Sequence, residues 1–314
     1  MHETAHSNVR WYLVFWIFVL SAVSFLDRVN ISVAGSSIAS DYHLSQIRLG
    51  WVFSAFLWGY ALFQAPGGWL VDRLGPRRVL TAGVLWWGVF TALTAAVSPK
   101  LAGAVFMFVA VRFLLGAGEA IMYPASNQFI SRWIPTQERG FANGLIFAGV
   151  GVGAGSAPAV VTYINVHYGW RWSFWFSALI GIAVGVVWFV GARDTPEEHG
   201  HVSSGELAHI QSGRTTQTGE QSAGKLAWSA ILRSKEVWAV TLSYFCFGYV
   251  AWIFFSWFYI YLLQVRGLNL KASAFYSTFP PLAMHSFCST LLSVNASISP
   301  RSRWQISRSF FAMV

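Results

Sequence analysis

Four ionisable residues stand inside the long apolar stretches of this 314-residue sequence: Asp27, Arg28, Arg112 and Glu119. A charge near the centre of a lipid bilayer costs at least about 2.5–3.5 kcal/mol, so such residues are kept only with a partner or a function. Their two positive and two negative charges balance, which favours pairing. An arginine can hold a carboxylate through parallel N–H groups, while a buried carboxylic acid can load and release a proton near neutral pH.

Further polar side chains recur at helical spacing around these charges. Glu119 and Tyr123 are four residues apart, Tyr60 and Gln64 likewise, and Arg112 precedes Glu119 by seven. Residues at these separations share one face of a helix. We therefore expect polar faces on several helices to line a water-accessible cavity. A buried ion-pair network that serves packing alone stays an alternative, most of all for Arg112, which lies near one end of its apolar run.

Helices that cross a membrane are needed to position such residues, and the composition predicts them. Of the residues 55% are hydrophobic, 17% are aromatic and only 11% are charged, with a mean hydropathy of +0.50. Soluble proteins carry about 25% charged residues, and a helical span needs about 20 apolar residues. Seven runs meet this length: 11–39, 47–71, 79–98, 101–131, 139–164, 171–191 and 237–263. An eighth, 273–293, is interrupted by Pro280-Pro281.

The basic residues indicate how the spans are oriented. The formal net charge of +9 would also suit a nucleic-acid partner, but the charges are distributed as membrane topology requires. With a cytoplasmic N-terminus, the cytoplasmic segments hold eleven Lys and Arg residues and the opposite segments five, in agreement with the positive-inside rule. The sequence thus predicts a multi-pass protein of the cell (inner) membrane, surrounded by lipid, with a cytoplasmic N-terminus and no nucleic-acid partner.

A long polar segment divides the chain. Residues 192–236 include many Gly, Ser, Thr and Gln residues, which is typical of a mobile linker. Six spans before such a loop and more after it are the layout of many secondary transporters. We expect a six-span N-terminal bundle at 1–191, a cytoplasmic linker loop at 192–236 and a partial C-terminal bundle at 237–293. A basic, Ser-rich tail follows at 294–314.

The most specific motif joins the second and third runs: Gly68-Trp69-Leu70-Val71-Asp72-Arg73-Leu74-Gly75-Pro76-Arg77-Arg78. It resembles the signature G-x-L-x-D-R-x-G-x-R-[RK] of the major facilitator superfamily. The resemblance implies an all-α polytopic membrane protein with the major facilitator fold, here a complete six-helix N-terminal bundle plus one to two helices of the C-terminal bundle. It also implies that the motif is a conformational latch on the cytoplasmic side. We therefore assign gating to five of its residues: Gly68, Asp72, Arg73, Gly75 and Arg77.

Three further segments narrow the resemblance. They are Phe25-Leu26-Asp27-Arg28-Val29-Asn30-Ile31-Ser32, then Ala65-Pro66-Gly67-Gly68, and then Arg112-Phe113-Leu114-Leu115-Gly116-Ala117-Gly118-Glu119-Ala120 together with Tyr123-Pro124-Ala125. They are similar to the anion:cation symporter family, which includes bacterial galactonate, glucarate and hexuronate carriers. In that family the residues matching Arg28 and Tyr60 contribute to the anion pocket, and acids matching Asp27 and Glu119 take part in proton coupling. Phe25 departs from some sugar-acid members, which carry tyrosine there.

These observations favour proton-coupled symport of a small organic anion such as a sugar acid. The candidate substrate-binding residues are Arg28, Tyr60, Gln64, Arg112 and Tyr123, and the candidate proton-coupling acids are Asp27 and Glu119. Efflux antiport of a drug or metabolite, or a non-transporting membrane interaction subunit, stay as alternatives. Arg28 argues against export of cationic drugs, which have no use for an anion-binding guanidinium. No nucleophile constellation, His cluster or metal-ligand spacing suggests an enzyme, a metal or a cofactor.

The C-terminal part departs from this pattern. A complete member of the superfamily has twelve spans, whereas seven or eight are recognised here. No acidic residue occurs from Val237 to Val314, and His285–Val314 holds eight serines without a span-length apolar run. We expect a C-terminally truncated chain that is inactive, with a shift of reading frame beginning near Met284. The intact parent is expected to be a monomer, and a genuine short form that works as a dimer is the alternative.

Overall fold

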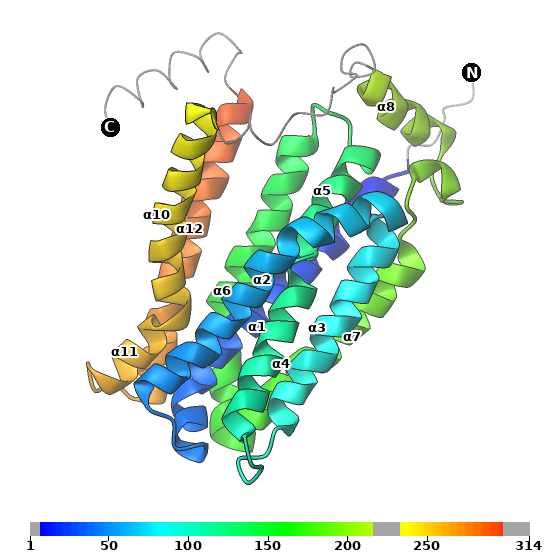
Figure 1. Cartoon of the computed structure of the whole chain (residues 1–314). Coiled ribbons are helices and arrows are strands. Elements are labelled where there is room, and N and C mark those ends of the chain that lie inside the picture. Colours follow the sequence, from blue (N-terminus) through cyan, green and yellow to red (C-terminus); the bar gives the residue numbers. More distant parts are fainter. Residues whose placement is uncertain (1–6, 216–232, 298–314) are drawn as a thin grey trace.

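The computed structural model describes residues 7–215 and 233–297, and within these ranges every regular element is a helix (Figure 1). The first part contains α1 (Val9–Asp41), α2 (Gln46–Leu74), α3 (Pro76–Ala96), α4 (Ala104–Glu119), α5 (Met122–Trp133), α6 (Arg139–Tyr168) and α7 (Trp170–Gly191). A short 3₁₀ helix, η1 (Pro196–Glu198), and α8 (Ser204–Thr215) follow. The later part contains α10 (Lys235–Ser256), α11 (Phe258–Gln264) and α12 (Leu270–Ser297).

Six helical stretches in the described part of the chain are long and apolar enough to cross a membrane. They are α1, α3, α4 with α5, α6, α7 and α10. The sequence predicts seven such spans, and the difference is α2, in which Trp, Tyr and Gln residues lower the mean hydropathy. At 29 residues α2 is nonetheless longer than a bilayer requires, and it packs along α4.

Close contact between α2 and α4 depends on glycine. A Cβ atom added at Gly116 would lie 2.1 Å from the carbonyl oxygen of Phe56, and one added at Gly59 would lie 2.0 Å from that of Phe113. Small residues of this kind let the backbones of membrane helices approach each other. The contact fixes Tyr60, on the same part of α2, beside α4.

The run predicted at 101–131 is bent rather than straight, because α4 ends at Glu119 and α5 begins at Met122. Pro124 explains the break: it has no N–H to donate to the carbonyl of Ala120, and its ring crowds the preceding turn. The bend places Glu119 at the end of a helix, in the middle of the bundle, where it is fully buried.

The interruption expected at Pro280-Pro281 is wrong, because α12 continues through both prolines as one helix from Leu270 to Ser297. The missing N–H groups weaken that turn. However, α12 packs along α6, and contact with a neighbouring helix supports proline inside membrane helices.

The segment expected to be a mobile linker is ordered over its first half. α8 lies at the N-terminal end of α1 (Figure 1), where the backbone N–H groups of Val9 and Arg10 donate to the buried carboxylate of Glu206 at 3.2 and 3.1 Å. The Arg10 guanidinium also pairs with Glu138 at 3.2 Å. Residues 216–232 of the predicted linker and 298–314 of the predicted tail lie outside the described residues.

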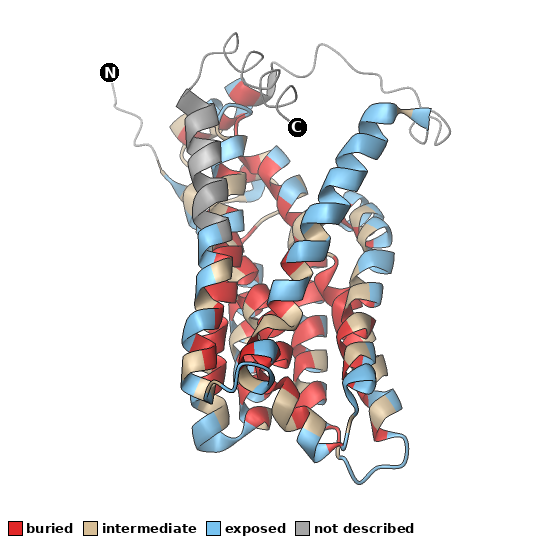
Figure 2. Ribbon diagram, turned by 90° about the vertical axis from the view of Figure 1, so that its left-hand side faces the viewer, coloured by how far each residue is buried: buried red, intermediate tan, exposed pale blue. Residues whose placement is uncertain are grey.

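α10 and α12 lie at one edge of the molecule (Figures 1 and 2). α10 is exposed from Lys235 to Phe247 and becomes buried only near its end, at Ala251 and Phe255. Beyond that end, the ring of Trp257 packs edge-on against Phe53 of α2 with centroids 5.3 Å apart. α10 therefore contacts α1 near its C-terminal end, where Trp257 meets α2, whereas α12 packs along α6.

Candidate functional site

A buried ion pair between Arg28 of α1 and Glu119 of α4 forms the centre of the site. The Nε of Arg28 lies 2.7 Å from Oε2 of Glu119, and the two side chains are 3% and 0% exposed. The hydroxyl of Ser24, one turn before Arg28, donates to the same oxygen at 3.0 Å. A charge-assisted hydrogen bond of this length compensates for the removal of both charges from water.

Aromatic rings surround the Arg28 guanidinium. Its Cζ lies 4.5 Å from the ring centroids of both Phe25 and Tyr60, and 5.5 Å from that of Phe56. Ring faces stabilise a guanidinium without using its N–H donors. Nη2 of Arg28 and Oε1 of Glu119 have no hydrogen-bond partner among the described residues, so the guanidinium has donors left for the carboxylate of an anion.

Asp27 points to a different side of α1 from Arg28, since neighbouring helical residues are about 100° apart. It is 1% exposed, and Thr91 of α3 donates to its Oδ2 at 3.4 Å. The hydroxyl of Ser177 on α7 lies beside the same carboxylate. Asp27 is therefore enclosed within the first bundle, apart from the aromatic rings around Arg28.

Arg112 is also fully enclosed, with 1% of its surface exposed. Its Cζ lies 5.1 Å from the ring centroid of Phe56, and it forms no ion pair within 4.0 Å among the described residues. Nε and Nη1 lack hydrogen-bond partners there. The charges of Glu119 and Asp27 act on Arg112 without direct contact.

The remaining predicted residues lie farther from the ion pair. The hydroxyl of Tyr123 lies 3.4 Å from that of Ser21, and its ring stacks on Phe147. Gln64 is half-buried, one turn along α2 from Tyr60, without a hydrogen bond to any described residue. The structure thus brings Arg28, Glu119 and Tyr60 into direct contact, with Tyr123 nearby.

The motif whose residues are predicted to act in gating forms contacts within the first bundle. Gln128 of α5 donates to Asp72 at 2.6 Å, and the Arg73 guanidinium stacks on Trp69. Gly68 lies next to Pro124, with 3.9 Å between a Cβ added there and the proline Cβ.

At the start of α3, Asp194 accepts a hydrogen bond from the backbone N–H of Arg77 at 2.9 Å. The Arg77 guanidinium donates to the carbonyl oxygen of Phe189 on α7. Gly75 has a φ of 85°, a conformation that glycine adopts without strain. Sequence reasoning missed Gln128 and Asp194, because contacts between distant segments leave no local pattern.

Sequence reasoning also missed the hydroxyl partners Ser24, Thr91 and Ser177. Serine and threonine are common in apolar helices, so their type carries little signal. Ser24 could have been found from its position, four residues before Arg28 on the same helical face.

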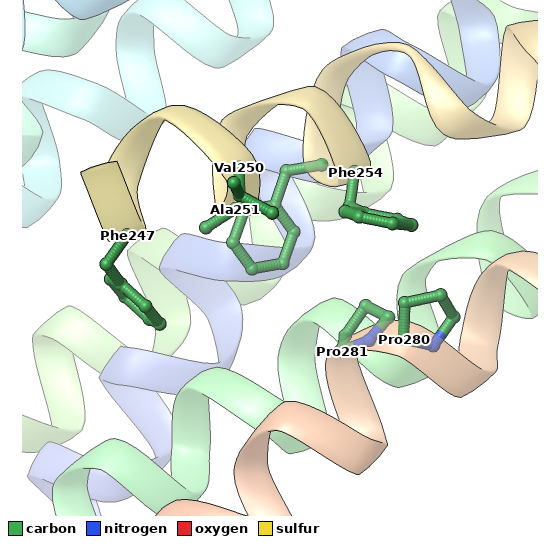
Figure 3. Close-up of a pocket in the computed structure, with 7 residues that line it drawn as sticks. Phe247, Val250, Ala251, Phe254, Pro280 and Pro281 are labelled. Carbon is green, nitrogen blue, oxygen red and sulfur yellow. The ribbon is translucent and has the colours of Figure 1, made fainter. Parts of the chain in front are cut away.

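A cavity between α10 and α12 offers no charge for an anion. It has a volume of about 180 Å³ (Figure 3). Its lining consists of Phe247, Val250, Ala251, Phe254, Phe255, Pro280 and Pro281. No group of three His, Cys, Asp or Glu side chains that could hold a metal occurs among the described residues.

The sequence of the chain is similar to those of known membrane transporters. The profile of the Major Facilitator Superfamily matches residues 17–314. The chain is 30% identical over 284 residues to “Probable galactarate/D-glucarate transporter GudP” of Bacillus subtilis (strain 168), covering 88% of this chain and 62% of that protein. It is 34% identical over 261 residues to “Probable sulfoacetate transporter SauU” of Cupriavidus necator, covering 83% and 59%. The chain thus spans about three fifths of the length of these relatives.

Solved structures share the fold. A bacterial homolog of the human lysosomal transporter Spinster has a TM-score of 0.71 at 19% identity, covering 93% of this chain and 64% of that one. A D-xylose-proton symporter has a TM-score of 0.64 at 16% identity, covering 90% and 68%. With a profile match over nearly its whole length and with transporters as relatives, the chain is a multi-pass membrane protein and not an enzyme; it belongs to the major facilitator superfamily of transporters.

Proposed function

We propose that the chain comes from a proton-coupled symporter of small organic anions, with sugar acids of the galactarate and glucarate type as the favoured substrates. The observation that carries this proposal is the buried Arg28–Glu119 pair, in which the guanidinium keeps an unpaired Nη2. The names of the relatives, which include transporters of two sugar diacids and of a sulfonated acid, support an anionic substrate.

Competition for Arg28 couples the proton to the anion. While Glu119 is ionised, it holds Nε of Arg28, and an incoming carboxylate is repelled by its charge. A proton on Glu119 removes that charge and releases Arg28, which then binds the anion through two N–H groups. Tyr60 positions the guanidinium through its ring, and Tyr123 and Gln64 contribute polar contacts to the substrate. Asp27 binds a second proton within the bundle, so that two protons cancel the charge of a sugar diacid and an inside-negative potential no longer opposes its entry.

Arg112 supports the anion site from a distance. Its position, enclosed at 1% exposure, gives it no surface for substrate in this conformation. Its positive charge acts on both Asp27 and Glu119, so it offsets part of the negative charge that these carboxylates bring into the bundle.

The motif of Gly68, Asp72, Arg73, Gly75 and Arg77 acts as the cytoplasmic latch. Its contacts with Gln128 and Asp194 hold the ends of α2 and α3 to α5 and α7. The first bundle, 1–191, then moves as one body against a second bundle that begins at 237. The protein lies in the cell (inner) membrane with a cytoplasmic N-terminus, and the transport unit is a monomer.

Binding of anions to the purified chain in lipid nanodiscs tests the proposal. Isothermal titration with galactarate, glucarate and sulfoacetate is expected to show saturable binding that strengthens from pH 7.5 to pH 5.5. Arg28→Ala should abolish it. Arg171→Ala is the matched control, because Arg171 forms an exposed ion pair with Asp41 at the far end of α1.

Two outcomes contradict the proposal. Unchanged affinity in Arg28→Ala would remove Arg28 from the site. Binding that weakens equally in Arg171→Ala would mean that net charge, and not the buried guanidinium, attracts the anion.

A further inference from the structure

Asp27 does not face the aromatic rings that surround the Arg28 guanidinium. Its carboxylate faces α3 and α7, where Thr91 and Ser177 are its polar neighbours. On α4, Glu119 and Arg112 are the charged groups that act on it. A hydronium ion that approached from the α4 side would meet the guanidinium of Arg112, which repels it. The proposed role of Asp27 in proton coupling, on which this inference rests, therefore needs another route.

A chain of buried polar groups leads away from Asp27 between α1 and α7. The amide of Asn30 donates to the hydroxyl of Ser177 at 3.3 Å, and the hydroxyl of Ser173 donates to the amide oxygen of Asn30 at 2.7 Å. These three residues, here named the α1–α7 polar seam, are between 0% and 1% exposed. None of them is charged, so no fixed positive charge in the seam repels a proton as Arg112 does.

The seam reaches the surface at the start of α7. The hydroxyl of Ser173 also lies 2.7 Å from the carbonyl oxygen of Trp170, whose indole N–H donates to Asp41 at 2.9 Å. The side chains of Asp41 and Arg171 are 40% and 36% exposed. Asp41 is thus an accessible carboxylate at the mouth of the seam, where it can collect protons from water.

Helix packing alone does not explain the seam at its inner end. Small apolar residues would bring α1 and α7 together at lower cost, since buried polar groups must be matched by partners. Oδ1 of Asp27 lacks a hydrogen-bond partner among the described residues. The Ser177 hydroxyl lies beside the Asp27 carboxylate, and a carboxylate with a free oxygen can accept a proton.

We propose that the α1–α7 polar seam is the proton path to Asp27 and that the Ser177 hydroxyl is its last relay. A water molecule that enters the seam as hydronium gives a proton to Oγ of Ser177, while the proton already on that oxygen passes to the carboxylate of Asp27. The hydroxyl is regenerated, the hydronium becomes water, and Asp27 gains one proton. Asn30 is a positioning residue that holds the two serines in line.

Time-resolved infrared spectroscopy of the full chain in nanodiscs after a drop in pH tests this path. The carbonyl stretch of protonated Asp27 is identified as the band that Asp27→Asn removes. Ser177→Ala is expected to slow the rise of this band at least about tenfold, because a positioned proton-transfer group typically accelerates such a step by about 10²-fold or more. Ser177→Thr keeps the hydroxyl and should restore the rate. Ser173→Ala should also slow it.

Thr94→Ala is the matched control, since Thr94 is a buried hydroxyl of α3 that bonds the carbonyl of Phe90 and not Asp27. A band that rises at the same rate in Ser177→Ala, Ser173→Ala and Thr94→Ala would overturn the seam and leave the symport proposal standing. A spectrum that Asp27→Asn does not change would overturn the role of Asp27 and the seam together.

Discussion

At the scale of the residue, Arg28 shows how a guanidinium can be buried and still available. One carboxylate and three aromatic rings stabilise its charge, while Nη2 keeps its donors. Lysine could not do this, because its ammonium is a point charge without a flat face to lie against the rings of Phe25 and Tyr60. The proposed chemistry of the site follows from the Arg28 guanidinium and from the competition between Glu119 and the anion for its N–H groups.

Glu119→Gln should uncouple anion binding from pH. Glutamine resembles the protonated acid, so Arg28 is free at every pH. We expect the variant to bind galactarate at pH 7.5 about as tightly as the unaltered chain does at pH 5.5, and to lose a dependence of up to about tenfold per pH unit. Titration calorimetry between pH 5.5 and pH 7.5 measures the affinity and its pH dependence. A pH dependence that survives in Glu119→Gln but not in Asp27→Asn would transfer the coupling role to Asp27.

Tyr60→Leu should weaken anion binding by removing one ring from the guanidinium. A desolvated cation–π contact is worth about 1–2 kcal/mol, so we expect a loss of about 5- to 30-fold in affinity. Tyr60→Phe keeps the ring and separates this effect from that of the hydroxyl. Equal losses in both variants would show that the hydroxyl, and not the ring, carries the contribution.

The central residues could be predicted from the sequence because charge is rare in apolar runs. Arg28, Glu119 and Tyr60 stand out by type and spacing, and the structure places them in contact. The sequence could not predict which helices the Asp27 side chain faces, because this depends on which helices pack against each side of α1. The same holds for Arg112, whose enclosure comes from the close approach of α2 and α4.

At the scale of the element, the α2–α4 contact controls the shape of the site. Gly116→Val places methyl groups where the carbonyl of Phe56 lies, so the helices must separate and Tyr60 moves from Arg28. We expect a loss of about 2–3 kcal/mol in the free energy of unfolding, measured by denaturant titration in micelles. Gly140→Ala is the control, because a Cβ there meets nothing within 4 Å. Equal stability of the two variants would contradict the role given to this contact.

α8 is held to α1 by Glu206, and Glu206→Gln should release it. An amide keeps the size of the side chain, but it lacks the charge that pairs with Arg10 at 3.5 Å and caps the helix N-terminus. We expect limited trypsin digestion to cut at Arg214 faster in the variant, while the spans stay protected. Glu198→Gln, at an exposed carboxylate of η1, is the control. Equal cleavage rates would mean that other contacts hold α8.

At the scale of the whole molecule, the sequence predicts the six-span bundle well, since long apolar runs and a specific motif mark it. The sequence does not predict the features that depend on packing between distant segments. α12 continues through two prolines because it packs along α6. α8 is held against the start of α1 by hydrogen bonds to the buried carboxylate of Glu206. Neither effect has a local signature in composition.

The polypeptide of these 314 residues is expected to bind anions but not to accumulate them. Alternating access needs two bundles that rock about a shared site, and here α10 faces outward over most of its length (Figure 2). Uptake of labelled glucarate into vesicles that contain the chain, compared with empty vesicles, measures this. Accumulation above the empty vesicles would support a dimer that completes the cavity.

The contact between Glu206 and the start of α1 also has a consequence for biosynthesis. The two segments are separated by 196 and 197 residues in the chain. At a synthesis rate of about 5–20 residues per second, the ribosome needs about 10–40 s to travel that distance. During this interval the first span stands in the membrane with its leading N–H groups capped only by water. The N-terminal end of α1, made first, is therefore among the last parts of the bundle to reach its final structure.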